Sequence, residues 1–271
     1  GKTIVLLHPG KSSAARESAA THTGAMMGDY QLMRMKVERA GVIFAETMEE
    51  LGDIAEIALR CPPIPAGGVA VLGESGAFKA LTLDLAEDLR LGMPAIKDAD
   101  SPALRAALPD FVSVSNPLDI TAQGLVDPDL YYRTLGALIG DDRFGAIVAG
   151  IIQNDPVTAA IKLPPILRAV GELKPTKPII FAGLDEGAEL SASWLAQLRE
   201  LGIPYFPTTE RAFRALKRLS DFAVRDFSEG NNAPLAAPGR GHDRPDHCDS
   251  PPSSVAAGVG AVEADAGSTT R

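Results

Sequence analysis

Four apolar segments alternate with helix-length segments along most of the chain, and this alternation restricts the fold more than any other feature. The apolar segments are residues 3–7, 68–72, 144–152 and 177–183. Each is apolar throughout instead of at every second position, as expected of a strand that is buried on both faces. Strands of this kind that alternate with helices form parallel sheets through right-handed crossovers. The sequence therefore predicts an α/β fold of parallel sheets with flanking helices.

The helical segments carry their own start and stop signals. Asp29 and Thr47 stand where N-caps are expected, and Glu50 completes the sequence pattern of a capping box with Thr47. Gly92 and Pro94 are expected to end the third helix. We predict helices over residues 29–40, 47–60, 76–92, 127–141, 158–173, 191–202 and 208–227.

A proline- and glycine-rich stretch divides the pattern. Residues 60–68 read RCPPIPAGG, which is typical of a linker. The strand and two helices before it are too few to close a doubly wound sheet, whereas the units after it suffice for a full domain. The end of the chain is rich in Pro, Gly, Ala and Ser, so it buries too little surface to offset its ordering entropy. We predict a partial domain over residues 1–61, a linker over 62–67, a complete domain over 68–225 and a disordered tail over 226–271.

Composition and charge argue against several classes of protein. The net charge of −9, without clustered Lys and Arg, argues against a nucleic-acid-binding protein. The longest apolar run, around residues 144–152, is about half as long as a membrane span. Cys61 and Cys248 lack the spacing of a disulfide framework or a metal site, so we expect no metal and a cytoplasmic location. The chain opens on a strand-like run without a Met, which leads us to expect a larger gene product around it.

One histidine lies in a conspicuous setting of small and polar residues. His22 stands between Thr21 and Thr23 and is followed by Gly24, a sequence typical of a loop. A neutral imidazole, abundant near pH 7, is a competent nucleophile toward a phosphoryl or acyl group. The two threonine hydroxyls would hold the ring in one tautomer. The same residues also suit an ordinary turn, and the pattern alone does not separate the two readings.

A second candidate follows the strand at residues 68–72. The sequence GESG, with Ser75 and Gly76, leads directly into a predicted helix. Backbone N–H groups at a helix N-terminus, together with the helix dipole, favour bound anions. The stretch is neither a Walker A motif nor a nucleophile elbow. A tight turn in which Ser75 merely caps the helix explains it equally well.

Polar clusters follow three further strand ends and are expected to form one ligand-facing rim. Asn116 and Asp119 belong to the first cluster, Gln153 and Asn154 to the second, and residues 183–189 form the third. His8 follows the first strand, and we expect a structural role for it. His242 and His247 show no metal-binding spacing.

The chain resembles the NDP-forming acyl-CoA synthetases, the superfamily that includes succinyl-CoA synthetase. Residues 2 to about 224 carry the resemblance, through THTGAMMG (21–28), then GESGAF (73–78) and the Asn-Pro-Leu-Asp sequence at 116–119. The resemblance implies flavodoxin-like parallel sheets with flanking helices in this chain, as a partial first domain followed by a complete second one. The resemblance places His22 at the family's phosphorylated histidine and implies that Ser75, Gly76 and Ala77 help to hold its phosphoryl charge. Glu74 puts a carboxylate beside that site, so the role requires this side chain to point away.

The resemblance also implies a reaction. The family interconverts acyl-CoA, NDP and phosphate with a carboxylic acid, CoA and NTP, through an acyl phosphate and a phosphohistidine. It uses ATP or ADP with Mg²⁺ in an ATP-grasp domain, and a CoA-binding domain, neither of which is in this chain. We therefore expect those domains or subunits as partners in an oligomer, and no nucleic acid or membrane.

Two alternatives remain beside this enzymatic interpretation. One is a non-catalytic truncated remnant or regulatory domain that keeps the fold and binds an acyl-CoA or a partner subunit. The other is an unrelated flavodoxin-like domain that binds a sugar or a nucleotide, which would leave the sequence around His22 unexplained. Neither the acyl substrate nor the choice between ADP and GDP is readable from these residues.

Overall fold

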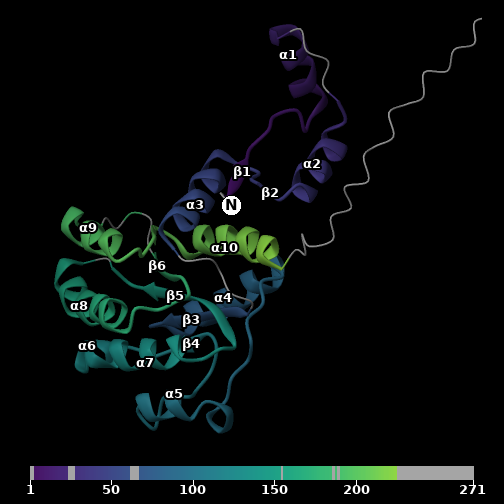
Figure 1. Cartoon of the computed structure of the whole chain (residues 1–271). Helices are drawn as coiled ribbons and strands as arrows, with labels where there is room; N and C mark the ends of the chain where they lie inside the picture. The colour runs from purple at the N-terminus through teal and green to yellow at the C-terminus, as the bar shows by residue number, and fades with distance from the viewer. Residues whose placement is uncertain are drawn as a thin grey trace, which may run out of the picture. The chain divides into compact units, whose positions relative to one another are not determined.

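Five strands form one parallel sheet in the order β4-β3-β5-β6-β7 (Figure 1). The computed structural model describes residues 3–23, 28–61, 67–153, 155–184, 187 and 190–224, with only the backbone at His22 and Thr23. Numbered within this sheet, the strand order is 2-1-3-4-5, the flavodoxin-like order. The predicted parallel α/β fold is therefore confirmed. The strands are β3 (Gly68–Gly73), β4 (Leu118–Asp119), β5 (Phe144–Ile151), β6 (Ile179–Gly183) and β7 (Tyr205–Phe206).

Consecutive residues of the strands face opposite sides of the sheet, and each side has its own core. In β3, Ala70 and Leu72 belong to one buried cluster, whereas Val69 and Val71 belong to the other. Side chains of α5, α7, α8 and α9 fill the first cluster, and those of α3, α4 and α10 fill the second. The bounds of these helices are α3 (Met48–Arg60), α4 (Gly76–Leu89), α5 (Pro102–Ala107), α7 (Asp129–Ile139), α8 (Pro156–Leu173), α9 (Ala192–Glu200) and α10 (Thr209–Ala223).

The first part of the chain contributes a second, two-stranded parallel sheet. β1 (Ile4–Leu6) pairs with β2 (Val42–Phe44), and α1 (Ser13–Thr23) and α2 (Tyr30–Arg39) lie between them in the sequence. The Asp29 side chain caps α2 as predicted, accepting a hydrogen bond from the Leu32 N–H at 2.7 Å. This part therefore has the strand–helix–strand pattern of the α/β class.

Helix α1 corrects the prediction of a loop around His22. The helix runs through Thr23, so Thr21, His22 and Thr23 are helical, whereas Gly24 lies outside the described residues. The Ser12 hydroxyl accepts a hydrogen bond from the Ala15 N–H at 3.1 Å and so satisfies one free donor of the first turn. Periodicity did not reveal this helix because its small and polar residues form no apolar stripe.

Several other elements differ from the sequence prediction. The strands β2, β4 and β7 were not predicted, because two or three residues are too few to show a period. Helix α4 ends at Leu89, with Arg90 in the left-handed region at φ 51°, earlier than Gly92. The unpredicted short helices are α5, α6 (Gln123–Val126) and the 3-10 turn η1 (Asp98–Asp100).

The capping box at the start of α3 is present only in part. The Thr47 hydroxyl accepts a hydrogen bond from the Glu50 N–H at 3.0 Å, as predicted for the N-cap. The Glu50 carboxylate, however, accepts the N–H of Glu46, not that of Thr47. It also binds the Arg218 guanidinium of α10 at 2.7 Å. Glu50 is therefore drawn toward α10 instead of closing the box.

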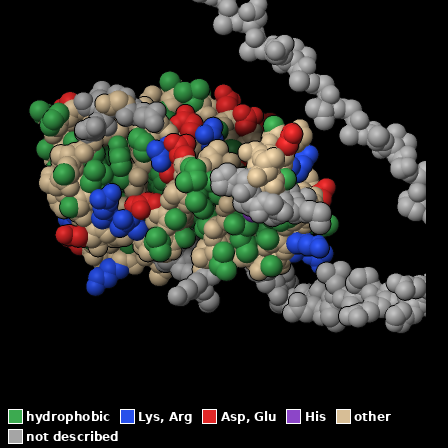
Figure 2. All heavy atoms as spheres, turned by 90° about the horizontal axis from the view of Figure 1, so that it is seen from above, with side chains coloured by type: hydrophobic (Ala, Val, Ile, Leu, Met, Phe, Trp, Pro, Cys, Tyr) green, Lys and Arg blue, Asp and Glu red, His purple; other side chains and the backbone are tan. Residues whose placement is uncertain are grey.

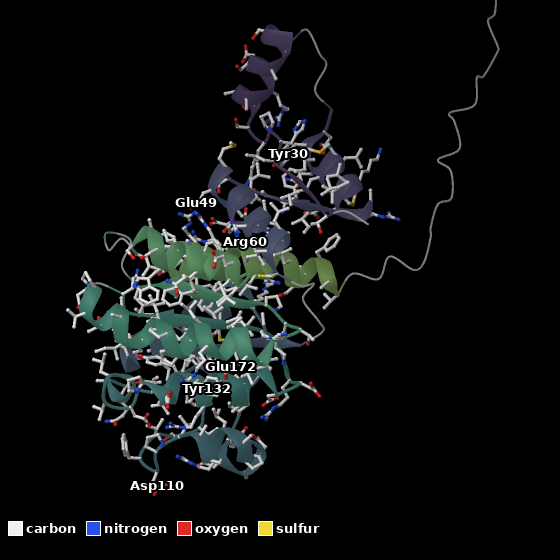
Figure 3. All side chains as sticks on the ribbon, turned by 60° about the vertical axis from the view of Figure 1, so that its left-hand side comes forward. Tyr30, Glu49, Arg60, Asp110, Tyr132 and Glu172 are labelled. Carbon is white, nitrogen blue, oxygen red and sulfur yellow. The ribbon has the colours of Figure 1, made fainter. Side chains whose placement is uncertain are left out.

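Helices on the two sides of residues 62–66 pack against each other and share one buried cluster. Ile54 and Ile57 of α3 lie in the same cluster as Phe213 and Leu216 of α10. Figure 3 shows the labelled Glu49 of α3 beside α10, where it pairs with Arg211. All described residues belong to one compact unit. The division into domains at residues 62–67 stays a prediction, as does the disorder of residues 226–271, which lie outside the described residues.

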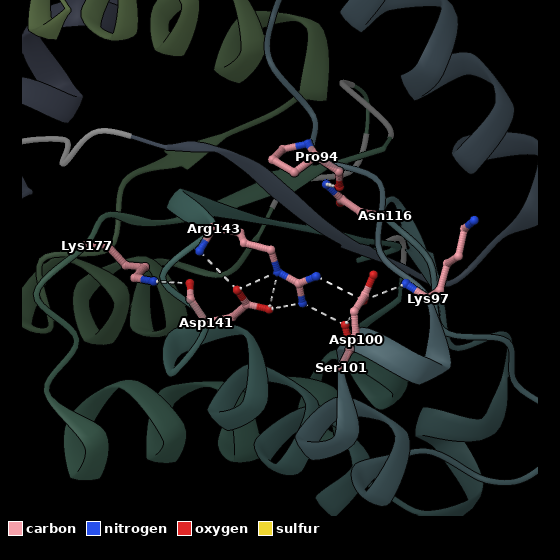
Figure 4. A network of polar contacts seen from close by, with 8 residues as sticks. All are labelled: Pro94, Lys97, Asp100, Ser101, Asn116, Asp141, Arg143 and Lys177. Atoms are coloured by element: carbon pink, nitrogen blue, oxygen red, sulfur yellow. Dashed lines mark hydrogen bonds and ion pairs between the residues drawn. The ribbon is translucent and has the colours of Figure 1, made fainter.

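A polar network joins the segment before β5 to the turn before α5 (Figure 4). Arg143 binds Asp141 through two N–H groups and reaches Asp100 at 2.9 Å and the Ser101 hydroxyl at 2.7 Å. Lys177 donates to the Asp141 carbonyl at 2.8 Å. A guanidinium can bind several acceptors at once, and here it joins the residues just before β5 to Asp100 and Ser101.

The surface carries charges of both signs, intermixed on the face shown in Figure 2. No described helix combines the length and the hydropathy that a transmembrane span requires.

Candidate functional site

The turn between β3 and α4 presents a capped helix N-terminus at the carboxyl edge of the sheet. Ser75 is the N-cap, and its hydroxyl accepts the Phe78 N–H at 3.4 Å. The prediction that Ser75 starts this helix is confirmed. Gly73 lies at the end of β3, and a Cβ on it would stand 2.5 Å from the Phe78 ring. The glycine therefore lets Phe78 seal the base of the turn, rather than giving room to a ligand.

Two backbone donors in the first turn of α4 remain free. The N–H groups of Gly76 and Ala77 have no hydrogen-bond partner among the described residues, and both residues are exposed. The first N–H groups of a helix lack partners within the helix and carry its positive dipole end. They can therefore bind an anion, such as a phosphoryl group.

Glu74 turns its carboxylate away from this helix start. Its side chain is 4% exposed and accepts from the Lys162 ammonium of α8 at 2.9 Å. The Tyr131 hydroxyl of α7 and the Ile152 N–H also donate to this carboxylate. The Glu74 carboxylate therefore does not occupy the anion site. It points away from the helix start, as the proposed role of Ser75, Gly76 and Ala77 requires.

Lys162 and Tyr131 are the polar residues of this region that sequence reasoning missed. Lys162 is 5% exposed and also donates to the Ile152 carbonyl at 2.9 Å. Burial, reinforced by the Glu74 carboxylate, raises the pKa of Tyr131 far above its usual range, so its hydroxyl stays a donor. The signal in the sequence was a lone lysine within the apolar stretch of α8, but nothing local pointed to its partner 88 residues away.

Asp119 is the predicted rim residue that the structure brings to the anion site. A Cβ on Gly76 would stand 3.5 Å from its Oδ2 atom, while its Oδ1 atom accepts the Thr121 N–H at 2.8 Å. A carboxylate here is favoured by the dipole of α4 and repels a second anion. The Asp119 carboxylate would therefore weaken the binding of an anion at this helix start.

Asn116 and Gln153, the other described rim residues, bond to backbone groups of the protein. Asn116 bonds the Val71 N–H and the Val69 carbonyl at 2.9 and 2.8 Å, so its amide extends the edge of β3. Gln153 is 4% exposed and accepts the Leu184 N–H at 3.3 Å, which ties the end of β5 to the end of β6. Both side chains satisfy backbone groups inside the protein, and their place in a ligand-facing rim stays a prediction. Asn154 and residues 185, 186, 188 and 189 lie outside the described residues.

The structure does not bring the predicted histidine to the anion site. The backbone of His22 lies near the end of α1, a helix that packs extensively against no other described element, α4 included. His8 is described, and its ring Nδ1 makes a short contact with the adjacent Pro9 carbonyl. The described residues also contain no group of three His, Cys, Asp or Glu side chains that would bind a metal ion.

Comparisons with known proteins agree with this architecture. The family model of the succinyl-CoA ligase like flavodoxin domain matches residues 1–58. A trans-feruloyl-CoA synthase from an unknown prokaryotic organism is 55% identical over 239 residues, covering 88% of this chain and 34% of that protein. The alpha subunit of the ADP-forming acetate–CoA ligase II of Pyrococcus furiosus is 27% identical, covering 77% of this chain and 45% of the subunit.

A solved structure has the same fold. Acetyl-coenzyme A synthetase 1 of Ca. Korarchaeum cryptofilum, in complex with phosphate and ADP, superposes with a TM-score of 0.70 at 24% identity, covering 82% of this chain and 47% of that one. The chain is an α/β protein whose residues 1–58 are similar to the succinyl-CoA ligase like flavodoxin domain. More particularly, the chain is similar in sequence to a trans-feruloyl-CoA synthase and to a subunit of an ADP-forming acetate–CoA ligase. It spans less than half the length of each of these three relatives.

Proposed function

We propose that this chain is the part of an NDP-forming acyl-CoA synthetase that carries the phosphohistidine and one of its binding places. The observation that carries the proposal is the first turn of α4, where Ser75 caps the helix and the N–H groups of Gly76 and Ala77 are free. The Glu74 carboxylate is held away from these donors. Free donors at a positive helix end, with no competing charge from the same turn, suit a transferable phosphoryl group.

His22 is the proposed acceptor of that group. Phosphate attacks the thioester carbonyl of the acyl-CoA, CoA leaves as the thiol, and an acyl phosphate forms. The neutral imidazole of His22 then attacks phosphorus, and the carboxylic acid leaves as its carboxylate. Transfer of the phosphoryl group from the histidine to ADP gives ATP. Since α1 packs extensively against no other described element, little packing opposes a change in its position during this sequence.

Thr21, Thr23 and Gly24 are proposed to support the histidine. The Thr21 hydroxyl bonds the Ser18 carbonyl of its own helix at 2.8 Å, which is the usual contact of a helical threonine. The Mg²⁺ that accompanies a nucleotide is assigned to the proposed ATP-grasp partner, as the family resemblance implies. The proposed partners are a CoA-binding and an ATP-grasp domain or subunit.

An aromatic acid is the proposed acyl substrate class. The relative that is 55% identical is a trans-feruloyl-CoA synthase, whereas the acetate–CoA ligase subunit is 27% identical. We therefore propose a hydroxycinnamic acid as substrate of the whole enzyme. Measuring kcat/KM for ferulate, acetate and 4-hydroxybutyrate with the assembled enzyme tests this, and a preference for acetate would contradict it.

The histidine assignment is tested with the assembled synthetase and labelled ATP. The parent enzyme and a His8→Ala control are expected to take up acid-labile, base-stable label, and His22→Ala is expected to take up none. Label that persists in His22→Ala would disprove the assignment. Absence of label in all three proteins, together with a normal fold, would favour the non-catalytic remnant.

A further inference from the structure

We propose that Lys162 and Tyr131 are positioning residues that hold the Glu74 carboxylate away from the anion site. This inference rests on the proposed function of the α4 N-terminus. Glu74 immediately precedes the cap residue Ser75, so its side chain starts within reach of the first turn. A free carboxylate there is the natural ligand of the helix N-terminus and would compete with a phosphoryl group for the N–H of Gly76.

The contacts of the cluster account for the direction in which Glu74 points. Its Oε2 atom accepts from the Lys162 Nζ and from the Ile152 N–H, both at 2.9 Å, and its Oε1 atom accepts from the Tyr131 hydroxyl. Lys162 is in turn bound to the Ile152 carbonyl. Both charged side chains are almost completely buried. A buried carboxylate is tolerated only with such partners, so the position of Glu74 depends on Lys162.

The same cluster connects loops that follow three strands. Glu74 follows β3, and Ile152 follows β5. Tyr131 packs so closely on Gly124, in the helix after β4, that a Cβ on Gly124 would collide with its ring. The cluster therefore links the segments around the anion site, in addition to the backbone hydrogen bond at 3.0 Å from the Ile120 N–H, after β4, to the Gly73 carbonyl at the end of β3.

Two further carboxylates, those of Asp155 and Asp119, lie in this region of the protein. Asp155 caps α8, where its side chain accepts the N–H groups of Val157 and Thr158 at 2.9 Å. Asp119 lies near Gly76 and is held by the Thr121 N–H. Neither makes a hydrogen bond to Lys162, whose described partners are Glu74 and Ile152. Removal of the Lys162 ammonium therefore takes an ion-pair partner from Glu74 but not from Asp119 or Asp155.

Lys162→Met in the assembled synthetase tests the inference. The released carboxylate is expected to raise the phosphate concentration at half-saturation about tenfold, which corresponds to losing one charge-assisted contact. The KM values for acyl-CoA and ADP are expected to stay within about twofold of the parent. The double variant Glu74→Gln with Lys162→Met is expected to recover most of the phosphate affinity, because a neutral amide competes weakly.

A second pair of variants keeps the test decisive if Lys162→Met does not fold. Tyr131→Phe removes one donor to Glu74 and keeps the ring on Gly124, and it is expected to raise the half-saturating phosphate about threefold. Tyr132→Phe is the matched control, since its hydroxyl binds the exposed Glu172 at 2.9 Å. The two labelled residues Tyr132 and Glu172 lie together in Figure 3.

Three outcomes would overturn the inference. They are an unchanged phosphate half-saturation in a folded Lys162→Met enzyme, a double variant as impaired as Lys162→Met, and equal effects of Tyr131→Phe and Tyr132→Phe. The labelling of His22 separates this failure from that of the proposed function. If labelling requires His22 but the half-saturating phosphate concentration is unchanged in Lys162→Met, only the positioning role is wrong.

Discussion

Arg211 donates two hydrogen bonds to Asp53, at 3.0 and 2.6 Å, although 158 residues separate them in the sequence. The pair joins α10 to α3, and the Asp53 side chain is 7% exposed. Arg218 and Glu50 repeat the arrangement further along α10. A basic side of α10 thus meets an acidic side of α3 above the apolar cluster that both helices share.

Asp53→Ala is expected to lower the free energy of unfolding by about 2 kcal/mol, because it leaves a half-buried guanidinium without its principal acceptor. Glu49 remains 3.4 Å from Arg211 and limits the loss. Asp221→Ala is the control. It removes an exposed partner of Lys217 and is expected to cost less than about 0.5 kcal/mol. Urea denaturation measures both, and equal midpoints would contradict the role of Asp53.

Gly73→Ala and Gly76→Ala are expected to differ although only two residues separate them. A Cβ at Gly73 meets the buried Phe78 ring at 2.5 Å, so we expect a loss of about 1–3 kcal/mol from overpacking. A Cβ at Gly76 meets only the Asp119 carboxylate at an ordinary 3.5 Å, so stability should change by less than about 0.5 kcal/mol. Thermal unfolding measures the stability of the two variants. A destabilised Gly76→Ala would contradict the prediction, because it would show that Gly76 has less room than the structure gives it.

Thr82→Val is expected to raise the free energy of unfolding by about 0.5–1 kcal/mol. The Thr82 side chain is 2% exposed, and its hydroxyl has no hydrogen-bond partner among the described residues. Valine keeps the shape and removes the unsatisfied group, which outweighs its slightly poorer fit to a helix. A lower melting temperature would indicate an internal water on this hydroxyl.

The Cys61 thiol is expected to resist alkylation at pH 8. Burial, together with the nearby Glu56 carboxylate, raises its pKa to about 12. About one molecule in ten thousand then carries the reactive thiolate at pH 8, and the rate should rise about tenfold per pH unit up to pH 11. The measurement uses iodoacetamide on a Cys248→Ser variant, which leaves Cys61 as the sole cysteine. A rate at pH 8 equal to that of a free thiol would refute the raised pKa.

The fold was predictable to the extent that it depends on local sequence. The largely buried strands β3, β5 and β6 were recognisable in the sequence as apolar runs, and Ser75 marked the start of α4. Strands β4 and β7 have two residues each and exist because longer neighbours offer them hydrogen bonds. Such elements follow from tertiary structure, so no period in the sequence reveals them.

The candidate site was predictable only in its backbone. The turn that we propose to bind an anion was predictable from Gly73, Ser75 and Gly76, but the direction of Glu74 depends on Lys162, which is distant in the sequence. At Asn116 and Gln153 the sequence showed the polar side chains but not their hydrogen-bond partners. Polar residues near strand ends suit a ligand rim, yet both are consumed by backbone groups that the fold leaves without partners.

The contact between α3 and α10 has a consequence for how the polypeptide can be divided. A backbone break within residues 62–66 would yield two fragments. One would expose the apolar face of α3, and the other would expose the apolar face of α10. Neither fragment should persist by itself in a cell, whereas synthesis of both together should let them reassemble. The first 61 residues could then be exchanged between relatives only along with a helix that matches α10, so recombination is expected to move the two as a set.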